Sequence, residues 1–354
     1  MITLVFCGDL RYCPYLKRYT ERLERVHAEY EVLFWNRAGL SLDVPDNYHY
    51  YDSPSDESLG MARKLVDFYG FRRWLYRYLK KNHTDGLILL STLSGLLLYP
   101  KAKKYPYIFD IRDYSFENIS VFRKIEKKVI KNSSFTCISS EGFRAFLPEH
   151  PYVIAHNFNR NEIPETNSES GCGDPIRIVW NGTVRFFDYQ KKYLDVFGND
   201  PRFQLIYHGT GVDLELFKQY CVDHDIRNVL FTGAYDNKNK ASLLQNADVL
   251  NNCYGGRDGD ELRYAISNRF YDGLVYRIPQ IVEPDGYKAG VTEKNGVGLA
   301  LPPDSDANDV LYNYLQNLNR DKFESSCRTL LEKIIREDDL YINRIDQFIM
   351  EDVK

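Results

Sequence analysis

The chain has 354 residues, of which 44% are hydrophobic, so it is not a disordered protein and is long enough for two domains. Its 46 Lys and Arg against 50 Asp and Glu give a net charge of −4, which argues against general nucleic-acid binding and leaves only a local basic pocket for an anion. No stretch reaches the roughly 18 consecutive apolar residues of a membrane span.

Cysteine usage and the first residues bear on the compartment. The seven cysteines are odd in number and no two have C-x-x-C spacing, so neither a zinc site nor a disulfide framework is indicated. The opening stretch MITLVFCGDL lacks a basic n-region and predicts a first buried strand rather than a signal segment. We therefore expect a cytoplasmic protein.

The first half of the chain alternates short apolar runs with amphipathic segments. The apolar runs predict strands at 2–7, 31–35, 86–91, 107–111, 135–139 and 152–157. The segments between them predict helices at 14–29, 57–81, 116–131 and 140–147. Such alternation is typical of βαβ units and of a parallel sheet buried on both faces.

A polar segment rich in Gly, Pro, Ser and Asn, residues 158–175, interrupts this pattern as a linker does. The alternation then resumes, with strands predicted at 176–182, 203–209, 229–233, 248–252, 278–282 and 298–302. The tail, 323–350, has apolar residues at helical spacing and predicts one or two packed helices.

We therefore predict an α/β protein of two similar domains. The predicted boundaries are an N-terminal domain at 1–160, a linker at 161–175 and a second domain at 176–325. C-terminal helices are predicted at 326–354, and they could pack against the first domain. Ligands of doubly wound sheets bind outside the carboxyl ends of the strands, so we expect sheets that face a central cleft and treat residues after strands as candidates.

The stretch WNGTVRFFDYQKKYLDVF (180–197) follows one such strand. Gly182 permits a tight turn near a ligand, and free N–H groups at a helix start attract anions. Arg185, Lys191 and Lys192 add cationic contacts that suit a phosphate. A solvated turn with surface basic residues explains the same pattern equally well.

The stretch SNRFYDGLVYRIPQIV (267–282) is a second candidate. Ser267 or Asn268 caps a short helix, and Asp272 lies about one turn from its start. The helix dipole alone explains Asp272, but it disfavours the neighbouring Arg269. A bound phosphate would reverse that preference, so the pattern favours an anion site.

The order of these motifs resembles the GT-B glycosyltransferases, close to the GT4-type enzymes of bacterial capsule and lipopolysaccharide synthesis. The second half contains, in sequence, WNGTVR, LIYHGTG (205–211), VLFTG (229–233), NADVLNN (246–252) and SNRFYDGLVYRIPQIV. The first half adds CISSEGFRAFLP (137–148) followed by YVIAHNF (152–158). The resemblance covers nearly the whole chain and implies the GT-B fold, with two Rossmann-like domains.

The resemblance also implies a donor diphosphate site in the second domain. Arg185 and a lysine, Lys191 or Lys192, match the basic pair that holds the donor diphosphate next to Gly182. Arg185 would then stabilise the departing nucleoside diphosphate and so act in catalysis.

The helix start implies the remaining donor contacts. By the resemblance, Ser267, Asn268 and Arg269 lie where a helix N-terminus meets the phosphates. Asp272 takes the position of a glutamate that hydrogen-bonds the nucleotide ribose.

Two positions depart from the family. Its E-x7-E pattern would place a further acid at 264, where this chain has Tyr264, and Asp260 and Glu261 are out of register. The histidine that many members use in the first domain is missing from YIFDIRDYSFENIS (107–120). Asp113, just past a strand end, is our catalytic candidate on the acceptor side, although a loop or helix cap explains it as well.

Three further features have residues that can contact a ligand. Gly8, Asp9 and Arg11 in the first loop are additional acceptor-side candidates. RDGD (257–260) has the D-x-D spacing of metal sites in another glycosyltransferase fold, but a basic phosphate site needs no metal, and we predict neither metal nor cofactor. His208 precedes a Gly-Thr-Gly turn and is better explained as a structural histidine.

Residues 68–83, FYGFRRWLYRYLKKNH, combine aromatic and basic side chains on one predicted helix. Contact with an anionic membrane surface explains this composition, and the protein would then be peripheral at the inner face of the cytoplasmic membrane. An ordinary packed helix with snorkelling basic residues explains it too.

The resemblance implies a retaining, metal-independent transfer of a sugar from a nucleotide-diphosphate sugar to a saccharide acceptor, which we expect to be linked to a lipid, in surface polysaccharide synthesis. Domain closure would bring the acceptor to the sugar and exclude water. A degenerate homologue that binds a nucleotide sugar or a partner without turnover, and a GT-B sugar-nucleotide epimerase, remain as alternatives. A dinucleotide-dependent dehydrogenase is disfavoured because no GxGxxG follows a strand.

Overall fold

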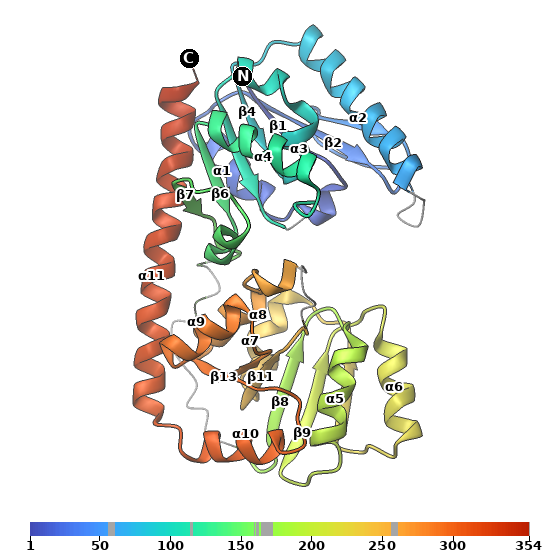
Figure 1. The fold of residues 1–354 in the computed structure, drawn as a ribbon, viewed down its shortest axis with the longest axis vertical. Helices are drawn as coiled ribbons and strands as arrows, with labels where there is room; N and C mark the ends of the chain where they lie inside the picture. The colour runs from blue at the N-terminus through green and yellow to red at the C-terminus, as the bar shows by residue number, and fades with distance from the viewer. Residues whose placement is uncertain are drawn as a thin grey trace. The chain divides into compact units, whose positions relative to one another are not determined.

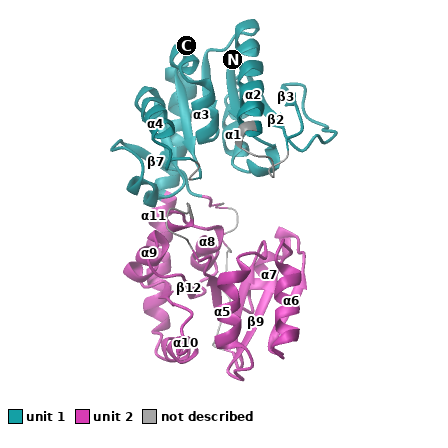
Figure 2. Ribbon diagram, turned by 45° about the vertical axis from the view of Figure 1, so that its right-hand side comes forward, with its two compact units in different colours: residues 1–156, 336–354 teal, residues 157–335 magenta. Residues whose placement is uncertain are grey.

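The computed structural model describes residues 1–55, 61–113, 116–158, 160, 163, 173–255 and 261–353. These residues form two compact units, residues 1–156 with 336–354 (unit 1) and residues 157–335 (unit 2), which Figure 2 shows in separate colours. Each unit is built on one parallel sheet, so the prediction of two α/β Rossmann-like domains is confirmed. Most of the predicted linker, 161–175, lies outside the described residues.

The sheet of unit 1 has seven parallel strands in the order β3-β2-β1-β4-β5-β6-β7 (Figure 1). In chain order they are β1 (Ile2–Phe6), β2 (Tyr30–Asn36), β3 (Tyr48–Asp52), β4 (Gly86–Leu89), β5 (Tyr107–Ile111), β6 (Phe135–Ile138) and β7 (Tyr152–Ile154). The strand order reverses between β1 and β4. The sequence does not predict β3, because YHYYD has no apolar run and its side chains are only half-buried.

Helices connect these strands. They are α1 (Leu16–Arg25), α2 (Met61–Lys81), α3 (Thr92–Leu98) and α4 (Ser120–Asn132), with 3-10 turns at Leu10–Tyr12, Lys101–Lys104 and Glu141–Ala145. The helix predicted at 140–147 is therefore a 3-10 turn, whereas α3 is not predicted. Ser91 caps α3 by accepting a hydrogen bond from the Ser94 N–H, a local signal that the sequence does contain.

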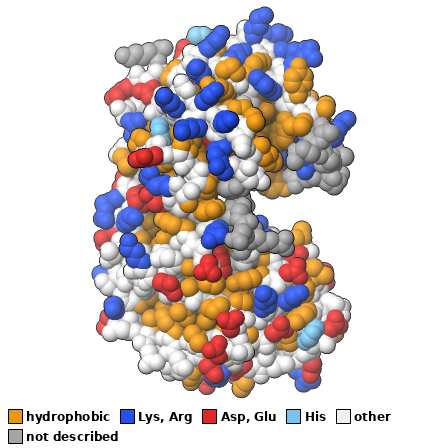
Figure 3. Space-filling view, viewed as in Figure 1, with side chains coloured by type: hydrophobic (Ala, Val, Ile, Leu, Met, Phe, Trp, Pro, Cys, Tyr) orange, Lys and Arg blue, Asp and Glu red, His pale blue; other side chains and the backbone are white. Residues whose placement is uncertain are grey.

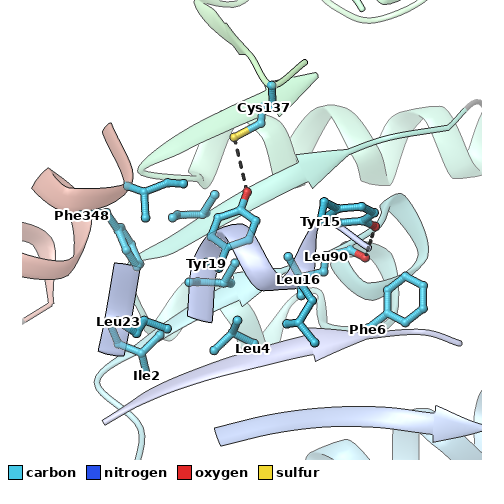
Figure 4. Packing of buried hydrophobic residues seen from close by; sticks show 14 of the residues in the cluster. Ile2, Leu4, Phe6, Tyr15, Leu16, Tyr19, Leu23, Leu90, Cys137 and Phe348 are labelled. Carbon is cyan, nitrogen blue, oxygen red and sulfur yellow. Dashed lines mark hydrogen bonds between the residues drawn. The ribbon is translucent and has the colours of Figure 1, made fainter. Parts of the chain in front are cut away.

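The core of unit 1 joins β1, α1 and the C-terminal end of the chain (Figure 4). Tyr19 packs among Leu4, Leu23 and Phe348, and its hydroxyl lies 3.8 Å from the Cys137 sulfur. Burying a large apolar side chain of this kind contributes about 1.5–3 kcal/mol. This packing fixes the loop after β1, which carries the predicted acceptor-side residues.

The sheet of unit 2 has six parallel strands in the order β10-β9-β8-β11-β12-β13. They are β8 (Ile176–Asn181), β9 (Phe203–His208), β10 (Val229–Gly233), β11 (Val249–Asn252), β12 (Gln280–Val282) and β13 (Gly298–Ala300). The helices are α5 (Phe187–Phe197), α6 (Leu214–Asp223), α7 (Lys240–Leu244), α8 (Asn268–Val275), α9 (Tyr287–Asn295) and α10 (Ala307–Gln316). The strand order reverses between β8 and β11, which is where such sheets bind ligands.

The predicted C-terminal helices form one helix, α11 (Arg320–Gln347), followed by a π-helical turn at Phe348–Asp352 (Figure 1). Its first half buries Phe323 and Ile334 in unit 2, and its second half buries Tyr341 and Ile345 in unit 1. None of the helices in the described part of the chain has the length and hydropathy that a membrane span requires.

Candidate functional site

The candidate site lies at the carboxyl ends of β8, β11 and β12 in unit 2. The residues that leave these strands there are Gly182, Tyr254 and Glu283, and α8 begins nearby, since its N-cap hydroxyl on Ser267 donates to Asn252 Oδ1 at 2.6 Å. This edge includes the point where the strand order reverses. Loops diverge at such a point, so a ligand can approach the backbone.

Three cations surround the ring of Tyr254. The Arg269 guanidinium carbon lies 4.9 Å from the ring centroid, that of Arg185 lies 5.9 Å away, and the Lys288 ammonium lies 4.2 Å away. Arg185 is exposed, whereas Arg269 and Lys288 are buried. The ring face attracts each cation, but positive charges so close together repel one another. An anion placed there would relieve that repulsion.

Arg269 bridges the two strands at the reversal point. Its Nε donates to the Asn181 carbonyl at 2.7 Å and its Nη1 to the Asn251 carbonyl at 3.0 Å, while the guanidinium stacks 3.5 Å from the Trp180 ring. Burial lowers the pKa of Arg269, and the Arg185 charge acts in the same direction. Two of the guanidinium nitrogens thus hold the backbone, which the sequence does not predict.

The third guanidinium nitrogen, Nη2, makes no hydrogen bond with a described residue. It lies 3.9 Å from the place that a Cβ would occupy on Gly182, whose φ of +110° is a conformation that glycine adopts readily. Gly182 therefore leaves the backbone next to this N–H group uncovered.

The N-terminus of α8 is not capped by a side chain. Because the Ser267 hydroxyl turns to Asn252, the N–H groups of Asn268 and Arg269 have no acceptor among the described residues. Open N–H groups and the positive end of the helix dipole favour an anion at this position.

Asp272 lies one turn into α8 and is buried. Its Oδ2 accepts a hydrogen bond from Asn181 Nδ2 at 2.9 Å, and its Oδ1 lies 2.9 Å from the ammonium of Lys240 at the start of α7. The carboxylate therefore has an internal cationic partner, and a ribose hydroxyl would have to share it with Lys240.

A second buried ion pair lies beside Tyr254. The Lys288 ammonium donates to the Asn252 carbonyl at 2.6 Å and lies 3.1 Å from Glu283 Oε2, which also accepts the Tyr254 N–H at 3.0 Å. The sequence motifs described above do not include Lys240, Tyr254, Glu283 or Lys288. The sequence did contain a signal for two of them: Glu283 directly follows the predicted strand 278–282, and Tyr254 lies two residues after the predicted strand 248–252.

Other predicted donor residues lie apart from this cluster of contacts. Lys191 lies 3.1 Å from Asp188 on the surface of α5, and Lys192 lies 5.8 Å from the Tyr189 ring. In the described part of the chain, neither lysine is recorded in contact with Tyr254 or Arg269. His208 ends β9 and pairs through Nδ1 with the Thr232 hydroxyl at 2.8 Å, and burial lowers its pKa.

The acceptor-side candidates lie at the carboxyl edge of unit 1. After β1 and Gly8, Asp9 accepts hydrogen bonds from the Arg11 N–H at 3.0 Å and from its guanidinium at 2.9 Å. The hydrogen bonds from Arg11 hold the pKa of Asp9 below its usual value, although burial raises it. Asp9 thus caps a 3-10 turn while its partner Arg11 remains exposed.

Asp113 follows a buried ion pair after β5. Arg112 lies 2.7 Å from Asp110 and donates to the Ala155 carbonyl, whereas the Asp113 side chain is exposed. The pKa of Asp113 is raised, chiefly because nearby protein displaces water from the carboxyl group, while the Arg112 charge lowers it. The RDGD segment lies outside the described residues, within which no group of three or more His, Cys, Asp and Glu side chains is placed to hold a metal ion.

No family model and no curated protein matches the sequence. Solved structures do match over almost the whole chain. HepE of Anabaena, in complex with UDP and glucose, has a TM-score of 0.66 at 12% identity, covering 97% of this chain and 98% of that one. Sucrose-phosphate synthase of Thermosynechococcus elongatus has a TM-score of 0.70 at 11% identity, covering 98% and 97%. The chain has the GT-B fold.

A third GT-B neighbour is WaaB, a lipopolysaccharide outer core galactosyltransferase solved without ligand. Its TM-score is 0.63 at 16% identity, and 99% of each chain is covered. These identities are low, so the likeness extends to the fold and leaves the chemistry to be argued from the residues.

Proposed function

We propose that the protein is a glycosyltransferase that transfers a sugar from a nucleotide-diphosphate sugar, bound on unit 2, to a saccharide acceptor. The observation that carries the proposal is the group of three cations, Arg185, Arg269 and Lys288, around Tyr254 where the strand order of unit 2 reverses. The structure of HepE with UDP and glucose, which has the same fold, supports it.

The diphosphate would lie against the open start of α8. The N–H groups of Asn268 and Arg269 and the free Arg269 Nη2 would donate to its oxygens, and Gly182 would allow the close approach. Arg185, exposed at the rim, would neutralise the charge that develops on the leaving diphosphate. Lys191 and Lys192 remain candidates for the same group.

Asp272 would accept a hydrogen bond from the nucleotide ribose. Its carboxylate already accepts from Asn181 and pairs with Lys240, but each carboxylate oxygen has two lone pairs and can accept a further bond. Lys240 would then hold the carboxylate in place.

The acceptor would lie at the carboxyl edge of the unit 1 sheet. Asp113 is the candidate there for a group that contacts the acceptor hydroxyl, because its carboxylate is exposed just after the carboxyl end of β5. Gly8, Asp9 and Arg11 would line the adjacent loop. A retaining, metal-independent reaction and a saccharide of surface polysaccharide as acceptor are part of this proposal, and the WaaB likeness supports the latter.

Nucleotide binding tests the proposal most directly. We would measure the thermal shift of the protein with UDP, GDP, CDP and dTDP and with their hexose derivatives. A ligand present at about 100 times its dissociation constant adds about 2.7 kcal/mol of stability. Arg185→Ala and Asp272→Ala are expected to lose the shift. Arg177→Ala is the matched control, since Arg177 lies near the amino end of β8, at the opposite edge of the unit 2 sheet, and pairs with Asp248.

The outcome separates the alternatives. If one nucleotide binds and a saccharide acceptor is extended, the transferase is supported. A changed sugar released without an acceptor would identify an epimerase instead, and binding without any turnover would identify a degenerate homologue. If no nucleotide and no nucleotide sugar binds the wild type, the proposal is wrong.

A further inference from the structure

Glu283 is a buried acid at the centre of the candidate site. It follows β12 directly, and only 5% of its surface is exposed. Its Oε2 accepts the Tyr254 N–H at 3.0 Å and lies 3.1 Å from the Lys288 ammonium. Lys288 supplies the counter-charge that a buried carboxylate requires.

The other oxygen, Oε1, is buried and makes no hydrogen bond with any described residue. A buried carboxylate oxygen without a donor carries a desolvation penalty, so native proteins rarely leave one unpaired unless a ligand or an ion completes it. The position of Oε1 therefore indicates a donor that is supplied from outside the chain.

A second buried acid of the same sheet shows what a purely structural carboxylate looks like. Asp248 precedes β11 at the amino edge, and both its oxygens are bonded, Oδ1 to the Gly173 N–H at 3.0 Å and Oδ2 to the Arg177 N–H at 2.8 Å. The Arg177 guanidinium adds a bond at 3.0 Å. The unpaired oxygen thus occurs at the edge where ligands bind and not at the opposite edge.

Tyr254 connects Glu283 to the cations of the proposed diphosphate site. Its N–H bonds to Glu283, and its ring faces Lys288, Arg269 and Arg185. A ligand that satisfied both groups would carry an anionic part for the cations and, next to it, a neutral hydroxyl that donates to Oε1. A nucleotide-diphosphate sugar has this combination.

We propose that Glu283 Oε1 accepts a hydrogen bond from a hydroxyl of the donor sugar and so selects which sugar is bound. This inference rests on the proposed function. Glu283 is thereby a specificity-determining residue, and Lys288 is its positioning partner.

Binding measurements on Glu283→Gln test the inference, because glutamine keeps the size of the side chain and removes its charge. We would measure, by titration calorimetry, the dissociation constants of the nucleoside diphosphate alone and of the matching nucleotide sugar. Glu283→Gln is expected to weaken the nucleotide sugar about tenfold or more, the usual effect of losing a hydrogen bond to a charged group, and not to weaken the diphosphate. The control Asp248→Asn is expected to change neither constant.

Donor analogues that lack single sugar hydroxyls identify the partner. For one hydroxyl, its removal is expected to weaken binding to wild type but to add no further loss in Glu283→Gln. Glu283→Asp, which keeps the charge next to Lys288 and shortens the side chain, provides the same comparison if the glutamine variant does not fold.

An equal loss for diphosphate and nucleotide sugar, or the same penalty for every deoxy donor in variant and wild type, overturns the inference and leaves the proposed function standing. Failure of every nucleotide to bind the wild type overturns the proposed function itself. The two failures are therefore distinguishable.

Discussion

At the carboxyl edge of the unit 1 sheet, the buried guanidinium of Arg112 lies 2.7 Å from Asp110, and Asp110 also accepts the Tyr19 hydroxyl at 2.7 Å. At the same edge of the unit 2 sheet, the buried guanidinium of Arg269 bonds to no carboxylate of the described residues and instead donates to two backbone carbonyls. The cost of burying the Arg112 charge is offset by an ion pair, whereas the cost of burying the Arg269 charge is offset only by backbone carbonyls and aromatic rings. Buried charge thus stabilises the first edge and leaves the second able to accept an anion.

The largest effect is expected from breaking the unit 1 pair. Arg112→Met leaves Asp110 as an uncompensated buried charge, which costs about 3–5 kcal/mol of unfolding free energy. Urea unfolding measures this loss. The double variant Asp110→Asn/Arg112→Met is expected to recover part of it, since no charge then remains buried.

The exposed pair Arg144–Glu141 provides the control. Its side chains are 42% and 44% exposed, so Arg144→Met is expected to change the unfolding free energy by no more than about 1 kcal/mol. Equal losses for Arg112→Met and Arg144→Met would contradict the distinction between the two sites.

Another buried acid of unit 1, Glu126, forms no ion pair with a cation among the described residues. Glu126 of α4 faces Glu117, with Arg123 and Tyr152 also near, and desolvation followed by the Glu117 charge raises the pKa of Glu126 from 4.5 to about 8. The native state therefore retains a proton that the unfolded chain releases above about pH 4.5. The contribution of Glu126 to the unfolding free energy is therefore fully present below that pH and is lost as the pH rises toward 8.

Glu126→Gln removes this titration. Between pH 5 and pH 8, wild type is expected to lose roughly 2–4 kcal/mol more unfolding free energy than the variant, as urea unfolding at the two pH values would measure. Glu141→Gln, which neutralises an exposed acid, is expected to keep the wild-type pH dependence. If the unfolding free energies of wild type and Glu126→Gln depend on pH in the same way, the pKa of Glu126 is not raised in the folded protein.

The sequence predicts features that depend on neighbouring residues, and it does not predict contacts between residues far apart in the chain. Buried strands have apolar runs, so twelve of them were visible locally, and only β3, which has no such run, was missed. Arg269 and Asp272 were selected because a helix start is also a local pattern. Their partners were not, since Asn181 lies 88 positions from Arg269 and Lys240 belongs to a polar NKNK segment that looks like surface.

The same reasoning explains the interpretation of residues 68–83. The sequence shows an aromatic and basic helix but not which face is covered. In the structure, Phe71, Leu75 and Leu79 are buried, so this apolar face packs inside unit 1, as the snorkelling interpretation expects. The exposed large apolar residues lie earlier on α2, at Leu65, Val66 and Tyr69.

The smallest effect on stability, with a separate effect on binding, is expected on the surface of α2. Lys and Arg side chains gather on the face of unit 1 that carries α2, α3 and α4 (Figure 3), and Arg73 and Arg77 are exposed near Tyr69. Contact with an anionic membrane is one of the two explanations that the sequence offers for this helix, and in such a contact each basic residue near the membrane surface would contribute about 1 kcal/mol. A membrane contact would bring a lipid-linked acceptor to unit 1.

Charge reversal on α2 and on unit 2 tests whether the α2 surface binds an anionic membrane. Arg73→Glu/Arg77→Glu is expected to reduce cosedimentation with vesicles containing anionic lipid more than tenfold, while the unfolding free energy changes by no more than about 0.5 kcal/mol. The matched reversal Lys218→Glu/Arg227→Glu, at exposed positions of unit 2, is expected to leave cosedimentation unchanged. Equal losses for the two reversals would mean that net charge alone governs vesicle binding, and the α2 surface would then have no special part in it.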